Sequence, residues 1–336
     1  MTTTALDSGV RRIECTVPAG EILPGEHFDI SLRVVLPSDG MTIAPAAFYC
    51  LVGGQTNLSF FDLGDEDDRR FSMAEALAQL GHIVMLADHP GIGRSSMPRD
   101  EWALTPDLLI KSHVAAARTA MGNLREGSLV PGLDPMPNLL PVGLGHSMGS
   151  VIMIDVQAAQ PIFAGLVLLG YGSGGLPQIL PPDAVEHARD IDWLRTYLPE
   201  LARERFGTAR LDPQVAKEKR RGRGQGSPSF HSGNADPDGK HALRGAAAPL
   251  LTQPGLFSMF PGVSDKPSAQ IEVPVLVVTG THDFIEAGEG LRAQFPACPS
   301  FEIFRPEDAG HNLFVFPSRT VSFARIAEWA QQLTTP

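Results

Sequence analysis

Short apolar runs recur along this chain, and amphipathic stretches separate most of them. The runs contain almost no polar residue, which is typical of strands buried on both faces of a sheet. They lie at 44–54, 82–87, 138–144, 163–169, 273–280 and 300–304. Together with two opening strands described next, they predict a mostly parallel central sheet of about eight strands.

The opening segment and the intervening stretches complete this pattern. Residues 12–17 and 28–37 are rich in apolar and β-branched residues, and a segment with several prolines and glycines joins them, which predicts an antiparallel pair. Four stretches predict helices, and they lie at 67–81, 105–124, 150–160 and 318–333. The second begins with Thr105 and Pro106, a favoured N-cap and first helical residue. Strands that alternate with helices indicate a parallel sheet flanked by helices.

One segment interrupts the alternation. Residues 175–268 separate two predicted strands by far more than a connection and one helix require, and apolar residues at 191, 194, 198 and 201 predict a helix within it. We therefore expect a core domain formed by 1–174 and 269–336, with 175–268 inserted as a helical cap. Within the insertion, 217–239 are expected to form a solvated loop.

Composition narrows the class of protein. The 336 residues are 43% hydrophobic and 19% charged, and the net charge is −11. An acidic chain is a poor partner for nucleic acid or an anionic membrane, so a small, mainly apolar substrate is expected. Three cysteines without paired spacing predict neither disulfides nor a zinc site. The N-terminal residues have no apolar signal core, which predicts a cytoplasmic protein, while self-association into a homo-oligomer stays open.

The sequence GHSMG places Ser147 between a predicted strand and a predicted helix. A serine on such a sharp turn has its hydroxyl exposed at the edge of the sheet. The turn crowds its neighbours, so the residues two before and two after must be small. Gly145 and Gly149 meet that requirement, and Ser147 is therefore the candidate nucleophile.

Later residues strengthen this interpretation. Asp283 follows a predicted strand in VVTGTHD, His311 follows the last predicted strand in EDAGHN, and LADHPGIGRSS contains a DxxGxGxS pattern. With Ser147 first, the order serine, aspartate, histidine resembles the α/β-hydrolase superfamily from about residue 28 to the end. The resemblance implies an α/β-hydrolase fold.

A serine hydroxyl needs a base within hydrogen-bond reach, and the base needs a group that fixes its tautomer. We assign these roles to His311 and Asp283. Glu286 and Glu307 are alternative acids, because each lies near one of the two loops. His146 and His282 are interpreted as packing or polar neighbours, because His311 lies in a glycine-flanked loop after the last strand.

Two backbone N–H groups are expected to stabilise the oxyanion formed during acyl transfer. Met148 follows the nucleophile and is the first candidate donor. Gly54, with Gln55 next, is the second, from the loop LVGGQTN. The resemblance places Val52 where related proteins have a histidine that braces this loop.

These assignments predict a serine hydrolase that cleaves an uncharged carboxylic ester, lactone or thioester without cofactor or metal. An acyltransferase or C–C bond hydrolase with the same triad is one alternative, and a ligand-binding homologue without turnover is another. Residues expected to line the substrate pocket are Gln55, Leu176, Trp193, Tyr197 and Phe257.

Overall fold

The computed structural model describes residues 9–221 and 230–333. An eight-stranded sheet in the order β1-β2-β4-β3-β5-β6-β9-β10 lies at its centre. Strand β2 pairs antiparallel with β1 and with β4, and all pairs from β4 to β10 are parallel. This confirms the predicted mostly parallel sheet. The strands are β1 (Arg11–Leu23), β2 (Glu26–Leu36), β3 (Ala46–Leu51), β4 (Ile83–Ala87), β5 (Leu140–His146), β6 (Gly165–Leu169), β9 (Val275–Val278) and β10 (Phe301–Phe304).

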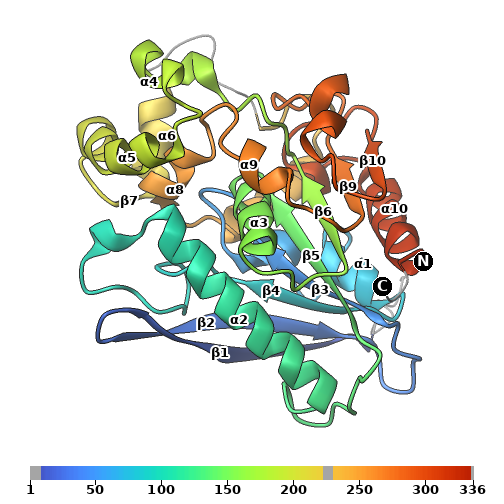
Figure 1. Ribbon diagram of the computed structural model, residues 1–336. Coiled ribbons are helices and arrows are strands. Elements are labelled where there is room, and N and C mark those ends of the chain that lie inside the picture. The colour runs from blue at the N-terminus through green and yellow to red at the C-terminus, as the bar shows by residue number, and fades with distance from the viewer. Residues whose placement is uncertain (1–8, 222–229, 334–336) are drawn as a thin grey trace.

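Helices cover both faces of the sheet (Figure 1). Helices α2 (Pro106–Glu126) and α3 (Met148–Ala159) pack on one face, and α1 (Met73–Ala78) and α10 (Arg319–Gln331) pack on the other. Strand β3 shows why the run at 44–54 lacks polar residues, because its alternate side chains enter two separate hydrophobic clusters and all six are buried.

The opening pair is longer than expected. Strand β1 extends to Leu23, so the tight turn lies at residues 24–25 and not across the whole of 18–27. The glycine- and proline-containing part of β1 is accommodated by register shifts between Pro18 and Gly20 and between Glu21 and Leu23.

Capping residues explain where two of the helices begin or end. The Thr105 side chain accepts a hydrogen bond from the N–H of Leu108, as expected, and Gly127 ends α2 in a left-handed conformation. Helix α1 is shorter than the predicted 67–81, because Ser72 caps the N–H of Glu75 and so starts the helix.

The insertion between β6 and β9 is mostly helical and gathers on one side of the sheet (Figure 1). The expected loop at 217–239 was wrong at both ends, where the chain is helical, and 222–229 lie outside the described residues. The helices of the insertion are α4 (Pro182–Glu186), α5 (Ile191–Phe206), α6 (Pro213–Arg221), α7 (Pro237–Gly245), α8 (Thr252–Phe257) and α9 (Asp265–Ser268), the last of which precedes β9. The insertion also contains two short antiparallel strands, β7 (Arg210–Leu211) and β8 (Leu250–Leu251).

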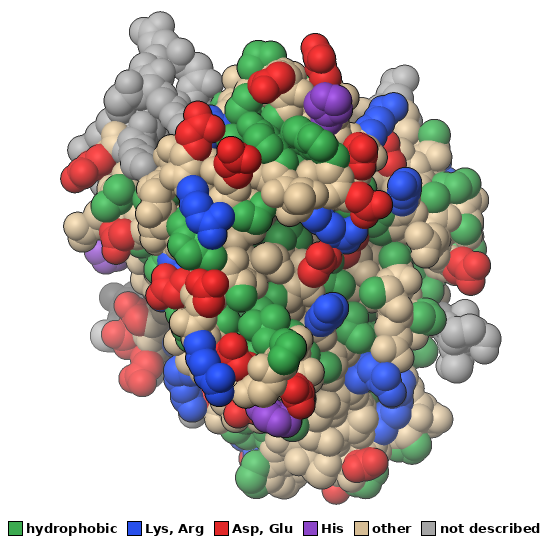
Figure 2. Space-filling view, turned by 60° about the vertical axis from the view of Figure 1, so that its left-hand side comes forward, with side chains coloured by type: hydrophobic (Ala, Val, Ile, Leu, Met, Phe, Trp, Pro, Cys, Tyr) green, Lys and Arg blue, Asp and Glu red, His purple; other side chains and the backbone are tan. Residues whose placement is uncertain are grey.

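Surface features add little to this organisation. Acidic and basic side chains are interspersed on the face shown in Figure 2. Among the described helices, none combines the length and apolar character needed to cross a bilayer. Cys15, Cys50 and Cys298 are free thiols.

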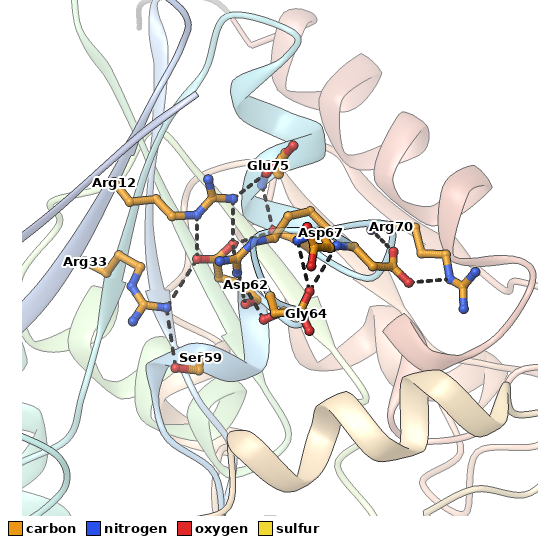
Figure 3. Close-up of polar contacts among 12 residues, drawn as sticks. Arg12, Arg33, Ser59, Asp62, Gly64, Asp67, Arg70 and Glu75 are labelled. Atoms are coloured by element: carbon orange, nitrogen blue, oxygen red, sulfur yellow. Dashed lines mark hydrogen bonds and ion pairs between the residues drawn. The ribbon is translucent and has the colours of Figure 1, made fainter. Parts of the chain in front are cut away.

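An ion-pair cluster fastens the opening hairpin to the parallel sheet domain (Figure 3). Arg12 of β1 donates to both carboxylate oxygens of Asp62 at 3.0 Å, and Arg33 of β2 donates to one of them at 3.2 Å. Ser72 donates to the other oxygen at 2.7 Å. Burial alone would raise the pKa of Asp62, but the hydrogen bond and charge of Arg12 outweigh it and lower that pKa.

We expect Asp62→Asn to lower the free energy of unfolding by about 3 kcal/mol, because two partly buried guanidinium groups lose their shared carboxylate. The matched control is Asp238→Asn, whose carboxylate pairs with Arg70 at the surface and is 75% exposed. Its loss should be below about 1 kcal/mol. Urea denaturation measures both, and equal losses would contradict this role of Asp62.

The wild-type protein and Asp62→Asn also give a pH test. Because the folded-state pKa of Asp62 is lowered, its stabilisation is complete above the unfolded pKa of about 3.9 and is lost as the pH falls through the folded value. The difference in unfolding free energy between wild type and Asp62→Asn should therefore be constant near neutral pH and shrink in acid.

Candidate active site

Ser147 lies on the sharp turn that the sequence predicted, between β5 and α3. Its backbone has φ 55° and ψ −120°, a strained conformation for a residue with a side chain. The N–H of Ser147 donates to the Leu169 carbonyl of the neighbouring strand β6 at 2.8 Å, and its own carbonyl accepts from Ser150. These contacts hold the serine at the carboxyl edge of the sheet.

The flanking glycines are required by close backbone contacts. A Cβ atom on Gly145 would lie 2.5 Å from the Gly149 carbonyl oxygen. A Cβ atom on Gly149 would lie 2.2 Å from the Leu51 carbonyl oxygen at the end of β3. Any side chain at either position would push the turn away from the sheet, which agrees with the steric interpretation of GHSMG.

Asp283 and His311 form a buried pair after the ends of β9 and β10. The Nδ1 atom of His311 lies 2.9 Å and 3.1 Å from the two Asp283 carboxylate oxygens. The Asp283 side chain is fully buried and also accepts from the N–H of Ile285 at 2.9 Å. The carboxylate can therefore hold the proton on Nδ1 and leave Nε2 of His311 unprotonated.

Aromatic rings surround the His311 ring, which is 1% exposed. Phe284 packs at 4.4 Å and Phe230, from the insertion, at 5.4 Å between ring centroids. Nε2 of His311 is buried and makes no hydrogen bond with any described residue, so it is available to accept a proton. Gly170 has φ +55°, and a Cβ there would lie 2.8 Å from the imidazole, which explains a glycine after β6.

His146 has a larger part than the sequence suggested. Its Nε2 lies 3.0 Å from the backbone carbonyl of His311 and, since that carbonyl can only accept, it donates the hydrogen bond. Its ring stacks on Phe60 at 4.4 Å. Burial lowers the pKa of His146 to about 3, so the ring is neutral. The residue before the nucleophile thus fixes the backbone of the candidate base, a contact that sequence spacing does not reveal.

The alternative acids and the other histidine lie away from this pair. Glu286 and Glu307 are exposed. His282 is half-exposed and lies 3.3 Å from Asp308, in agreement with its interpretation as a polar neighbour. Of the acids considered, the described structure brings only Asp283 to His311.

The candidate oxyanion donors lie beside Ser147. Gly54, Gln55 and Met148 line the same pocket as the serine. Met148 is the first residue of α3, so its N–H has no intrahelical acceptor. Gln55 has φ 66°, a left-handed conformation that is uncommon for a residue with a side chain. This strained turn follows directly on Gly54 and shapes the loop that faces the nucleophile.

The pocket at Ser147 has a volume of about 70 Å³ and is mainly apolar. None of its described lining residues carries a charge. Leu176, Leu250 and Met259 reach it from the insertion, and Ser258 and Tyr171 also line it. The other apolar side chains that line it are Val151, Phe230, Phe284 and Ile285.

Three residues expected in the pocket lie elsewhere. Trp193 and Tyr197 stack on each other along α5 at 4.6 Å between ring centroids, and neither lines the pocket at Ser147. Phe257 is 1% exposed and belongs to the hydrophobic core. Large apolar side chains of the insertion mostly pack it together, whereas Leu250 was missed because its approach to Ser147 depends on tertiary folding.

The described residues contain no group of three or more histidine, cysteine, aspartate or glutamate side chains arranged to hold a metal ion.

Comparison with known proteins agrees with this geometry. A model of the alpha/beta hydrolase family matches residues 53–324. No curated protein sequence is similar enough to count as a relative. A solved lipase in its open form has 17% sequence identity and a TM-score of 0.62, with 96% of this chain and 99% of that chain covered.

Two further structures have the same fold. A thermophilic esterase from Thermogutta terrifontis is 17% identical with a TM-score of 0.54, and the match covers 97% of this chain and all of the esterase. A monoacylglycerol lipase from Paleococcus ferrophilus is 19% identical with a TM-score of 0.56, covering 88% and 97%. Because the family model spans most of the sequence and the fold agrees, the chain belongs to the alpha/beta hydrolase family.

Proposed function

We propose that this protein is a serine hydrolase that cleaves an uncharged carboxylic ester, lactone or thioester through an acyl-enzyme on Ser147. The observation that carries the proposal is the buried pairing of His311 Nδ1 with both oxygens of Asp283, which leaves Nε2 free. The strained turn at Ser147 supports it, because such a turn presents a serine hydroxyl at the strand edge.

In the first half of the reaction, His311 Nε2 accepts the hydroxyl proton as the Ser147 oxygen attacks the substrate carbonyl carbon. Asp283 stabilises the imidazolium that forms, and the backbone N–H groups of Met148 and Gly54 donate to the oxyanion. His311 then gives its proton to the leaving alcohol or thiol. The bond between the carbonyl carbon and the leaving oxygen or sulfur breaks, and the acyl group stays on Ser147.

In the second half, water takes the place of the leaving group. His311 accepts a proton from the water as its oxygen attacks the acyl carbon, and returns that proton to the Ser147 oxygen when the ester bond breaks. Ser147, His311 and Asp283 are thus regenerated, and no redox change or cofactor is needed.

The pocket favours an uncharged acyl or leaving group. Its lining is mainly apolar and has no charged side chain among the described residues, so a substrate carboxylate or ammonium group would be buried without a partner. The volume of about 70 Å³ favours a small group beside Ser147. Residues from 175–268 supply several lining side chains, which supports a role for this segment as a substrate-selecting cap.

Two alternatives use the same residues differently. An acyltransferase or C–C bond hydrolase would form the same activated serine but transfer the acyl group to another acceptor, or release a carbon leaving group. A binding protein would keep the pocket without turnover. Steady hydrolysis of simple p-nitrophenyl esters, lactones and thioesters separates the proposal from the binder.

We expect Ser147→Ala to lower ester turnover by on the order of 10³-fold or more while the fold is kept, because no acyl-enzyme can form. Turnover of p-nitrophenyl acetate and a melting curve measure the two properties. Ser150→Ala is the matched control, since its hydroxyl lies one helical turn away and donates to the Leu169 carbonyl. Near-normal turnover by folded Ser147→Ala would exclude Ser147 as the nucleophile.

Asp283→Asn should also lower kcat, by roughly 10³-fold or more, because an amide in place of the carboxylate favours the wrong tautomer of His311. Glu307→Gln removes an exposed carboxylate from the same region and should leave kcat within about twofold. Comparison of the two kcat values shows which carboxylate orients His311. A severe loss of kcat in Glu307→Gln alone would show that Glu307, and not Asp283, has this role.

Met259→Ala should enlarge the pocket and shift preference towards longer acyl chains. Filling the vacated space with two or three methylenes is expected to raise the ratio of kcat/KM for the hexanoate over the acetate ester by about tenfold. Tyr197→Ala, which truncates a side chain outside the pocket, should leave the ratio unchanged. An equal shift in both variants would contradict the pocket assignment.

A further inference from the structure

Within the candidate oxyanion loop, residues 52–58, the Thr56 hydroxyl donates to the Gly53 carbonyl at 3.0 Å, but no side chain of the loop reaches the Val52 carbonyl. Val52 is fully buried among apolar residues and cannot donate a hydrogen bond, and two glycines follow it. An oxyanion donor must be fixed in position, and loop backbones are more mobile than the strands they follow. The Val52 carbonyl must therefore be held by a contact from elsewhere in the chain.

One contact comes from a chain of three buried side chains that ends on the loop. Nε2 of His89 lies 2.9 Å from the Val52 carbonyl oxygen, and its Nδ1 lies 2.8 Å from Nε2 of His113. Nδ1 of His113 lies 3.0 Å from the hydroxyl oxygen of Tyr49. All three side chains are at most 1% exposed, so water does not complete or interrupt the series.

The direction of every hydrogen bond in the series follows from its end. The Val52 carbonyl can only accept, so Nε2 of His89 donates to it. Burial lowers the pKa of His89 to about 4 and that of His113 well below its usual value, so both rings are neutral. Nδ1 of His89 must then accept from His113, whose own Nδ1 accepts from the Tyr49 hydroxyl. The Tyr49 hydroxyl, His113 and His89 thus donate in one direction, so each hydrogen bond strengthens the next, up to the bond with the Val52 carbonyl.

The far end of the loop is held by the residue next to His89. The Asp88 carboxylate accepts from the N–H of Leu58 at 2.7 Å. Asp88 is itself fixed, since its N–H donates to Ser31 and its carbonyl accepts from Ser95. Gly93 leaves room for it, because a Cβ there would lie 1.9 Å from the carboxylate. Asp88 and His89 are thus hydrogen-bonded to the two ends of the loop.

The middle of the loop pairs with the insertion. Ala248 donates its N–H to the Gln55 carbonyl at 2.9 Å, and Asn57 donates to the Ala246 carbonyl at 2.9 Å. These bonds fix the loop laterally but do not reach Val52 or Gly53. The Thr56 hydroxyl holds the Gly53 carbonyl, and the Val52 carbonyl depends on His89.

We propose that His89, oriented by His113 and Tyr49, is a positioning residue that holds the oxyanion loop through the Val52 carbonyl and so places the Gly54 N–H against the substrate oxygen. This inference rests on the proposed function for the oxyanion role. The bracing of the loop itself does not depend on it. The side chain acts through the backbone and has no contact with the substrate.

Three substitutions test the proposal. His89→Leu removes the donor to Val52, and His89→Gln keeps an amide N–H near the position of Nε2. His82→Leu is the matched control, because His82 is also fully buried and its Nδ1 lies 3.0 Å from the Ala46 carbonyl at the opposite end of β3. The control thus removes the same kind of bond from the same strand, away from the site.

Amide hydrogen exchange of peptides covering 52–58 gives the readout that does not need activity. We expect exchange to accelerate at least about tenfold in His89→Leu, to recover in His89→Gln, and to stay unchanged in His82→Leu even if both leucine variants melt at lower temperature. Should His89→Leu not fold, Tyr49→Phe removes only the outermost donor and should give a smaller acceleration at the same peptides.

Ester kinetics give the second readout. In His89→Leu, kcat should fall roughly 10- to 100-fold with KM within about twofold, because the loss acts on the oxyanion and not on ground-state binding. Unchanged loop exchange in folded His89→Leu, or equal effects in His82→Leu, would overturn the inference. Failure of the proposed function would instead show as an absence of ester turnover in the wild-type protein, which leaves the exchange result decisive.

Discussion

The left-handed turn at Ser147 is the constraint on which the site depends. A residue at φ 55° and ψ −120° costs on the order of 1–3 kcal/mol, and such strain persists only where the surroundings determine the geometry. The surroundings here are the start of α3, which leaves room only for glycine at 145, and the end of β3, which leaves room only for glycine at 149. The rigid sheet therefore sets the position of the serine, and Asp283 and His311 follow the ends of β9 and β10 in the same sheet.

Much of this arrangement could be predicted from the sequence because it depends on local patterns. Apolar runs identified the strands, Thr105 identified the start of a helix, and the glycines around Ser147 identified the turn. Asp283 and His311 each follow a predicted strand, and the resemblance to the α/β-hydrolase superfamily paired them. The observed strand order places the ends of β5, β9 and β10 at one edge of the sheet.

The remaining features depend on contacts between distant segments, which no local pattern records. His146 was interpreted as a neighbour of the serine, yet it fixes the carbonyl of His311, 165 residues later. Trp193 and Tyr197 were expected in the pocket, but their helical spacing reflects packing on each other. Leu250 and Met259 reach the pocket only because the insertion returns across the sheet edge.

The insertion also contacts the candidate catalytic residues and the candidate oxyanion loop. Backbone hydrogen bonds join residues 246–248 to the oxyanion loop, and Phe230 packs on the His311 ring. In the proposed function, the segment that selects substrates also stabilises the loop that acts on them. Residues 246–248 therefore belong with the sheet edge in any shortened variant.

In the proposed reaction, His311 and Asp283 activate Ser147. Labelling with a fluorophosphonate, followed by mass spectrometry of the digested protein, tests it most directly, because this electrophile reacts with activated serines. We expect one adduct per chain, located on Ser147, and a large loss of labelling rate in folded His311→Ala. An adduct on another residue, or folded protein that stays unlabelled at Ser147, would contradict the account.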